Sequence, residues 1–137
     1  MTIQLSVAVV NGMLDAIETV IGVSAVVKLK SGAQPANCAT ADSGTVISTM
    51  SLASDWAAAA SSGSKAFSST PIEDASADAT ETLAHYRVYA SDGTTCHMQG
   101  TITATGGGGD MTVDNVSVTA GQVIRITGWT INMTGHA

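Results

Sequence analysis

Histidines and cysteines are the residues of this chain best suited to metal binding or covalent chemistry. His85 and His97 flank an Asp-Gly turn, and pairing outward from that turn predicts that they lie near each other across a hairpin. Two histidines could hold a metal ion, but no Asp, Glu or Cys at a matching strand position completes the ligand set. Cys96, for example, would point to the opposite face of its strand from His97. We therefore expect surface or interface histidines and no metal site, and we expect His136 to lie in the C-terminal tail.

The two cysteines are far apart in the sequence. Cys38 falls in a predicted loop and Cys96 in a predicted strand, with no C-x-x-C or Cys/His spacing typical of zinc. The N-terminus has neither the basic region nor the cleavage site of a secretory signal, so nothing indicates an oxidising compartment. The sequence allows a single disulfide but favours two reduced, partly buried thiols.

The other motifs with a chemical meaning are incomplete. Gly106–Gly109 is not followed by the Lys-Ser/Thr pair and helix of a phosphate-binding loop, so we expect a flexible hairpin loop. Asp110, Asp114 and Asn115 lack the spacing of a calcium-binding loop. No serine lies in a G-x-S-x-G motif, and paired carboxylates fall in predicted loops. These absences predict a protein that is not an enzyme and that uses no cofactor or metal.

Aromatic residues offer a different kind of site. Trp56 and Phe67 lie in an uncertain segment, and an exposed pair would make a platform for a sugar or a protein partner. Tyr86 and Tyr89 could add stacking surfaces for a sugar. Trp129 is expected in the core or in a subunit interface.

The composition excludes several classes of partner. Charged residues make up 12% of the 137 residues, against about 25% in a typical soluble domain, and the net charge is −6. No run of bases could neutralise successive phosphates, so we expect no nucleic-acid binding. No apolar run of 18 or more residues occurs, so we expect no membrane span. The length fits one domain, residues 1–137, with its own core. The five bases are Lys28, Lys30, Lys65, Arg87 and Arg125.

One helix is predicted, over about residues 2–22. Its apolar positions recur every four residues, and Gly22 provides a stop because glycine adopts the left-handed conformation at little cost. We favour packing of this wide apolar stripe over a sheet; the alternative is contact with a partner subunit. The stripe comprises Leu5, Val9, Met13, Ile17 and Ile21.

Alternating apolar residues and frequent turns predict at least seven short strands, hence an antiparallel β-sandwich or jelly roll with one N-terminal helix. Asp92-Gly93 predicts a tight hairpin, and a change of apolar phase at Gly128 predicts a β-bulge. Residues 53–69 fit either a helical turn or a long loop. The predicted strands are Ser24–Lys30, Thr45–Leu52, Thr82–Ala90, Thr95–Thr103, Asp110–Val113, Val116–Thr119 and Gln122–Met133.

A series of weak motifs follows one order along nearly the whole chain. They are L-S-x-A-x-x-N-x-x-x-D-A-I at residues 5–17, S-G-A-Q-P-A at 31–36, A-x-x-G-T-x-I at 41–47, D-A-S-A-D-A-T at 74–80, S-D-G at 91–93, and V-T-A-G…I-T…T-I-N-M at 118–133. In this order the chain resembles a family of small tailed-phage virion proteins, the head decoration or cement proteins. The lysines at 28 and 30 and the glycine run at 106–109 depart from the family pattern.

The resemblance implies a structural role without catalysis. The protein would bind the outer surface of the major capsid protein lattice and stabilise the head, as a homodimer or alternatively a homotrimer. It would be made in the bacterial host cytoplasm and reside on the capsid surface. We expect the partner interface to include Gln34 and Pro35, in a loop free to touch a neighbour, together with Trp56 and Phe67. The alternatives are a carbohydrate-binding protein and a tail or connector component of the virion.

Overall fold

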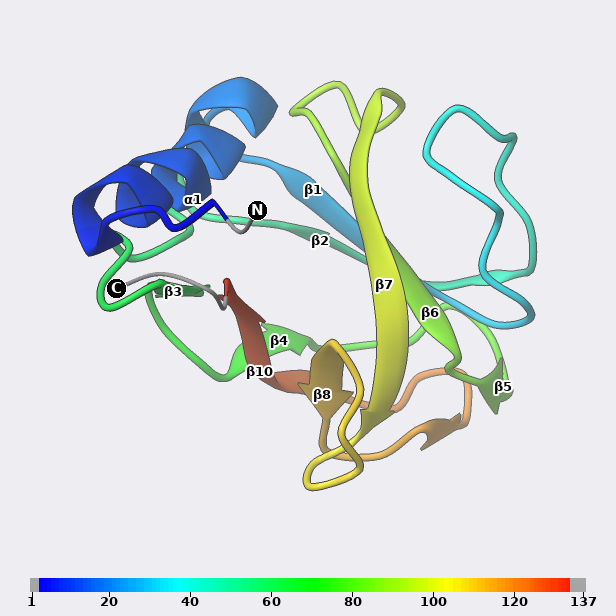
Figure 1. The fold of residues 1–137 in the computed structure, drawn as a ribbon. Coiled ribbons are helices and arrows are strands. Elements are labelled where there is room, and N and C mark those ends of the chain that lie inside the picture. Colours follow the sequence, from blue (N-terminus) through cyan, green and yellow to red (C-terminus); the bar gives the residue numbers. More distant parts are fainter. Residues whose placement is uncertain (1–2, 134–137) are drawn as a thin grey trace.

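The computed structural model describes residues 3–133 of the chain. One helix precedes a series of short strands (Figure 1). In chain order the elements are α1 (Val7–Ile21), β1 (Val26–Lys30), β2 (Val46–Ser51), β3 (Ser64–Ala66), β4 (Ile72–Asp74), β5 (Glu81–Thr82), β6 (His85–Tyr89), β7 (Cys96–Ala104), β8 (Met111–Val113), β9 (Ser117–Val118) and β10 (Ile124–Asn132).

The strands form one large, strongly curved sheet in the order β2-β1-β6-β7-β8-β10-β3, with β4 also paired to β10, and a small β5-β9 sheet. Every pairing is antiparallel except β7 with β8. β7 joins strands β2, β1 and β6 to strands β8, β10 and β3, since it pairs with β6 at residues 96–101 and with β8 at residues 102–104. The predicted mainly β, sandwich-like fold with an N-terminal helix is confirmed.

The helix is shorter than predicted. It begins at Val7 because Ser6 caps it: the Ser6 hydroxyl accepts a hydrogen bond from the Val9 amide at 3.3 Å. It ends at Ile21, and the predicted stop at Gly22 is confirmed, with φ at 90° and the Gly22 amide donating to the Glu18 carbonyl.

Two local predictions from glycines are confirmed. Gly93, with φ at 71°, turns the chain between β6 and β7, and the Asp92 carboxylate accepts the amides of Thr94 and Thr95. The register of β10 against β8 shifts between Ile126 and Gly128, which is the predicted bulge. It allows Ile126 and Trp129 to face the same core despite their different parity.

The segment of residues 53–69 is neither a helical turn nor an open loop. Bridges between Ala57 and Phe67 and between Ser61 and Ser64 fold it into a small hairpin, whose strand β3 pairs with the end of β10. Packing against α1 and β10 decides this structure, which the small, polar sequence of the segment left open.

The glycine run at residues 106–109 does not close a hairpin, because the strands that it joins are parallel. The loop doubles back tightly over Thr103, and the Gly109 amide donates to the Thr103 hydroxyl at 2.9 Å. A Cβ atom at Gly107 or Gly109 would come within 2.8 Å of Thr103 atoms. The glycines therefore permit close approach of the backbone, which a short connection between parallel strands requires.

An aromatic cluster occupies the core. The rings of Phe67 and Trp129 stack with centroids 4.9 Å apart, and Trp56 packs against both. Trp56 is 2% exposed and Phe67 is 7% exposed, so the prediction of an exposed aromatic platform is wrong. Tyr86 and Tyr89 are buried as well.

Candidate functional site

The polar side of α1 faces the protein. Three side chains spaced along one side of the helix accept hydrogen bonds from backbone amides of the hairpin between residues 57 and 67, and these bonds satisfy amides that would otherwise lack a partner. The pairs are Asn11 with the Gly63 amide at 2.9 Å, Asp15 with the Ala60 amide at 2.8 Å, and Glu18 with the Ala57 amide at 3.2 Å.

A buried lysine strengthens this attachment. The Lys65 ammonium lies 2.9 Å from an Asp15 carboxylate oxygen and 3.3 Å from a Glu18 oxygen, and it donates a third bond to the Ala58 carbonyl. Its side chain is 1% exposed. Hydrogen bonds from Lys65 and the Ala60 amide lower the pKa of Asp15 below its ordinary value. The charged groups of the helix are thus used to hold it in place.

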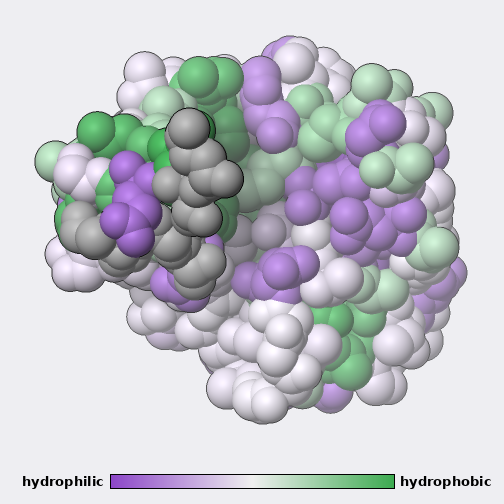
Figure 2. All heavy atoms as spheres, in the orientation of Figure 1, coloured by the Kyte–Doolittle hydropathy of each residue, from purple (hydrophilic) through white to green (hydrophobic). Residues whose placement is uncertain are grey.

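The opposite side of α1 is apolar and exposed. The favoured prediction, that the stripe from Leu5 to Ile21 packs over a sheet, is wrong for its middle, because Val9 is 49% exposed and Met13 is 48% exposed. The helix instead buries Val10, Leu14 and Ile21, and Val20 is 67% exposed. Figure 2 shows hydrophobic surface over the helix. This exposed side, which we call the α1 face, carries no charge; it comprises Ala8, Val9, Gly12, Met13, Ala16, Thr19 and Val20.

A groove of about 310 Å³ runs along this helix. Its walls include Met13, Ile17 and Val20 from α1, and His97 from the start of β7. The groove extends the exposed apolar surface from the α1 face toward the large sheet.

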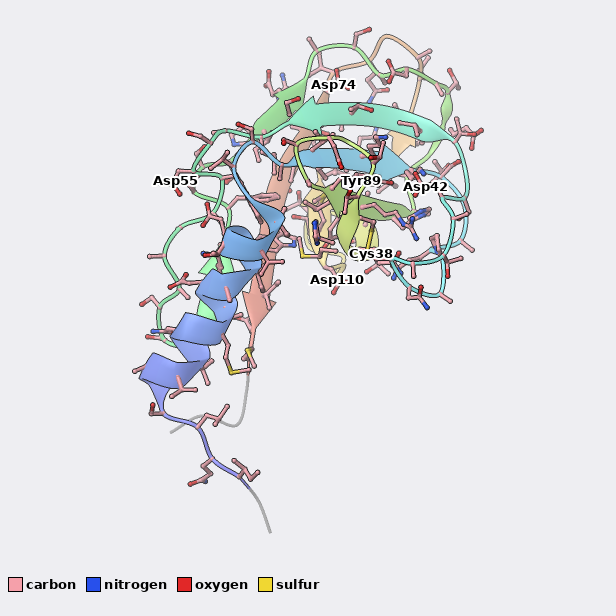
Figure 3. All side chains as sticks on the ribbon, turned by 90° about the horizontal axis from the view of Figure 1, so that it is seen from above. Cys38, Asp42, Asp55, Asp74, Tyr89 and Asp110 are labelled. Carbon is pink, nitrogen blue, oxygen red and sulfur yellow. A yellow bond between two sulfur atoms is a disulfide. The ribbon has the colours of Figure 1, made fainter. Side chains whose placement is uncertain are left out.

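A second feature is the loop of residues 31–45, which covers the outer face of β1 and β6. Lys30 and Arg87 are buried beneath it, and both reach Asp42 of the loop. The Lys30 ammonium and the Tyr89 hydroxyl both donate to the Asp42 Oδ2 atom, each at 2.7 Å, and the Arg87 guanidinium donates to Oδ1. Figure 3 shows Asp42 and Tyr89 side by side. β1 is therefore buried on both faces, which its alternating pattern did not reveal.

The electrostatics of this cluster favour ionised Asp42. Partial burial alone would raise the pKa of Asp42, but hydrogen bonds from Lys30, Tyr89 and Arg87 together hold it far below the ordinary value. Burial, followed by the bond to Asp42, raises the pKa of the Tyr89 hydroxyl. Arg87 also donates to two loop carbonyls at 2.9 Å each. The cluster holds the loop onto the sheet.

A disulfide fixes the same loop. Cys38 is bonded to Cys96 at the start of β7, with the two Cα atoms 5.3 Å apart (Figure 3). The favoured prediction of two reduced thiols is wrong. The contact between the two cysteines could not be predicted from the sequence alone, because it depends on the path of the loop over β6.

The loop is less free than predicted. Gln34 is exposed, but Pro35 is buried, and the Pro35 carbonyl accepts a hydrogen bond from the Gln99 side chain at 2.7 Å. Gln34 and Pro35 lie on the side of the molecule where the loop crosses the sheet, whereas Trp56 and Phe67 lie in the core. The structure does not bring the four predicted interface residues into one surface.

The histidines do not meet. His85 pairs with Thr101, and it is buried with its Nδ1 atom 3.0 Å from the Gly32 carbonyl. Its Nε2 atom has no hydrogen-bond partner within the described part of the chain. Burial lowers the pKa of His85, so it is neutral at pH 7. His97 is exposed in the groove beside α1, and His136 lies outside the described residues.

The acidic residues considered as calcium ligands have other partners. Asp110 accepts hydrogen bonds from the Thr101 amide and hydroxyl, both at 2.9 Å, and Asp114 accepts from the Arg125 amide. Over residues 3–133, no group of three or more His, Cys, Asp or Glu side chains is arranged to hold a metal ion. The same residues include no helix that is both long and apolar enough to cross a membrane.

Sequence reasoning gave an exposed apolar side of the helix only as the alternative to packing over a sheet. The signal was present in Asn11, Asp15 and Glu18, whose spacing puts them on one side of the helix, but only the position of Lys65 shows that this side turns inward. The chain matches no protein-family model, no curated protein and no solved structure.

Proposed function

We propose that this protein is a structural subunit of a larger assembly, and specifically a decoration protein that binds the outer surface of a phage capsid lattice. The order of motifs described above supports the capsid assignment. The single structural observation that supports an assembly role is the α1 face, an exposed apolar surface on a helix whose charged groups are already used internally.

The chemistry of this face fits a protein partner. Cores of protein interfaces are depleted in charged residues and rich in apolar side chains, and Met is among the enriched types. The face from Val9 to Val20 has these properties, and the groove beside it would accept a protruding side chain. Large exposed apolar surfaces are uncommon on monomeric proteins and mark sites of interaction. We propose that this surface contacts the capsid lattice and that attachment requires no bond-making chemistry.

A binding assay with empty capsids tests this proposal. The protein is mixed with capsids of the phage that carries its gene, and bound protein is separated by sedimentation. A double variant, Met13→Asp with Val20→Asp, places two charges on the α1 face and is expected to abolish co-sedimentation. The double variant Thr119→Asp with Ala120→Asp, which adds the same two charges at exposed sites on a distant turn, is the matched control and is expected to bind.

Three outcomes contradict the proposal. One is failure of the unaltered protein to bind capsids; another is undiminished binding by the double variant of the α1 face. Cryo-electron microscopy of particles supplies the third: density confined to the tail axis would identify a tail or connector component, whereas density across the lattice agrees with decoration.

A further inference from the structure

A vacant strand position lies in the large sheet. β8 sits between β7 and β10 and pairs with both, but it is only three residues long. Above Met111 the chain leaves the sheet, and β7 and β10 continue without a strand between them in the described residues (Figure 1). We call this position the β8 slot; it is bounded by residues 98–101 of β7 and residues 130–132 of β10.

The spacing suits an extended backbone. Where β8 is paired on both sides, β7 and β10 are two strand separations apart, about 9.5 Å. A groove of about 300 Å³ continues from this level, and its walls are formed by Gln99 and Asp110 on one side and Thr130 and Asn132 on the other. The groove therefore follows the line that β8 would take if it were longer.

Unpaired backbone groups face the slot from β7. The Ile102 amide donates toward the β6 side, to the Ala84 carbonyl, whereas the Thr101 amide points the other way, to Asp110. Because successive residues of a strand direct their backbone groups to opposite sides, the amide and carbonyl of Gln99 face the slot. The Asp110 carboxylate accepts the Thr101 amide in place of a backbone carbonyl, and it closes the end of the slot nearest β8.

The same alternation holds on β10. The Met133 amide donates to the Gly63 carbonyl on the β3 side. The backbone groups of Thr130 and Asn132 therefore face the slot, and both residues are exposed. Two strand edges thus present donors and acceptors to the same space.

The inner side of the slot is apolar. The side chains of Met98 and Ile131 are partly buried against the core on either side of it. Between them the Tyr86 ring crosses over Gly100, where a Cβ atom would approach within 2.7 Å of the ring, and its hydroxyl accepts a hydrogen bond from the Trp129 indole at 3.0 Å. An inserted strand would rest one apolar side chain on this base, between Met98 and Ile131.

We propose that the β8 slot binds an extended segment of a partner polypeptide with apolar side chains at alternate positions, which completes the sheet in line with β8. Backbone hydrogen bonds to both edges would supply affinity, and the pocket between Met98 and Ile131 would select the inward side chain. This site is distinct from the α1 face, and the proposal does not depend on capsid binding.

The geometry favours a flexible segment of another protein over a second folded copy. An occupant must have both edges free, because it pairs on both sides. Each strand of this fold is already paired on at least one side.

A synthetic peptide provides the test. The probe is the fluorescent hexapeptide Thr-Val-Thr-Val-Thr-Val, with a control peptide in which the central valine is proline. Anisotropy measures binding, and amide hydrogen exchange followed by NMR locates it. We expect slower exchange of the Gln99, Thr130 and Asn132 amides with the first peptide and no change with the second.

Two variants separate the slot from the rest of the molecule. Thr130→Pro removes an amide that faces the slot but leaves the pairing with β3, because the Thr130 amide does not point toward β3. It is expected to weaken peptide binding about tenfold. Thr130→Ala keeps the amide and is expected to bind normally, as is the double variant of the α1 face.

The proposal is overturned if neither peptide binds at millimolar concentration, or if protection appears on the outer edge of β2 and not at the slot. It is also overturned if Thr130→Pro, shown to be folded by circular dichroism, binds as well as Thr130→Ala. Protection of the slot amides that grows with protein concentration in the absence of peptide would identify a second copy as the occupant and overturn the assignment to a separate partner.

Discussion

Reduction of the Cys38–Cys96 disulfide is expected to lower the free energy of unfolding by about 4 kcal/mol. The two residues are 58 positions apart. A crosslink that closes a loop of this length reduces the entropy of the unfolded chain by about 14 cal/mol/K, which is about 4 kcal/mol at 25 °C. Since domains of this size are stable by only about 5–15 kcal/mol, the disulfide contributes a large share of the total.

Urea unfolding with and without a thiol reductant measures this contribution. Trp56 and Trp129 are buried, so their fluorescence reports loss of the core. The double variant Cys38→Ala with Cys96→Ala is the control; it is expected to match the reduced protein and to ignore the reductant. We expect the reduced protein to remain folded, because Asp42 still holds the loop against the sheet.

The reasoning would be refuted by a loss of less than about 1 kcal/mol on reduction, with the disulfide shown by mass spectrometry to have been intact beforehand. A double variant that still responds to the reductant would point to an effect of the reductant itself and would equally contradict the assignment.

Four other expectations follow from the polar contacts of Tyr86, Asp42 and His85. Tyr86→Phe leaves the buried Trp129 indole without its acceptor and is expected to cost about 1–3 kcal/mol in urea unfolding; an unchanged midpoint would show that the bond contributes nothing. Burial raises the pKa of Tyr86 to about 12, so absorbance titration should show no ionisation of Tyr86 at pH 10 while the protein is folded. Asp42→Ala leaves two buried bases without their carboxylate and is expected to cost about 3 kcal/mol, whereas Asp42→Glu should recover part of the loss. Folding lowers the pKa of His85, so the unfolded chain binds a proton at a higher pH than the folded protein does. The Tm should therefore fall as the pH drops through about 6.5, and it should fall less in His85→Gln. An equal dependence of Tm on pH in the two proteins would contradict this expectation.

Local signals in the sequence predicted the helix and most strands of the fold, but not β3 and β4. Gly22 ends the helix, Asp92-Gly93 forms the hairpin and Gly128 marks the bulge because each depends on backbone geometry that few residues allow. The mainly β character followed from alternation, which needs no knowledge of distant contacts.

Features that depend on distant contacts were not predictable in this way. The orientation of α1 is set by Lys65, which lies 50 positions from Asp15, and hydropathy alone would turn the helix the other way. The burial of β1 on its outer face depends on the loop that ends near Asp42. The parallel pairing of β8 requires the tight turn over Thr103, and a glycine run gives no indication of strand direction.

The candidate sites divide in the same manner. The expectations for histidines, cysteines and tryptophans came from residue type. The structure instead buries His85 and Trp56 and joins the two cysteines in a disulfide. The α1 face and the β8 slot consist of residues without reactive side chains. They are recognised by apolar side chains that stay exposed and by backbone groups that no strand pairs. Such sites emerge only when the partner of each backbone group and each apolar side chain is known.

The Cys38–Cys96 bond also sets a mechanical property. It turns residues 38–96 into a covalent ring, and the two ends of the chain leave this ring through the bonded pair. A pulling force applied at the ends would pass through the sulfur atoms and bypass the chain within the ring. About 200 Å of contour length is thereby withheld from extension, since each residue contributes at most about 3.5 Å. Under load, only the segments that precede Cys38 and follow Cys96 would extend, while the covalent ring between them would stay closed.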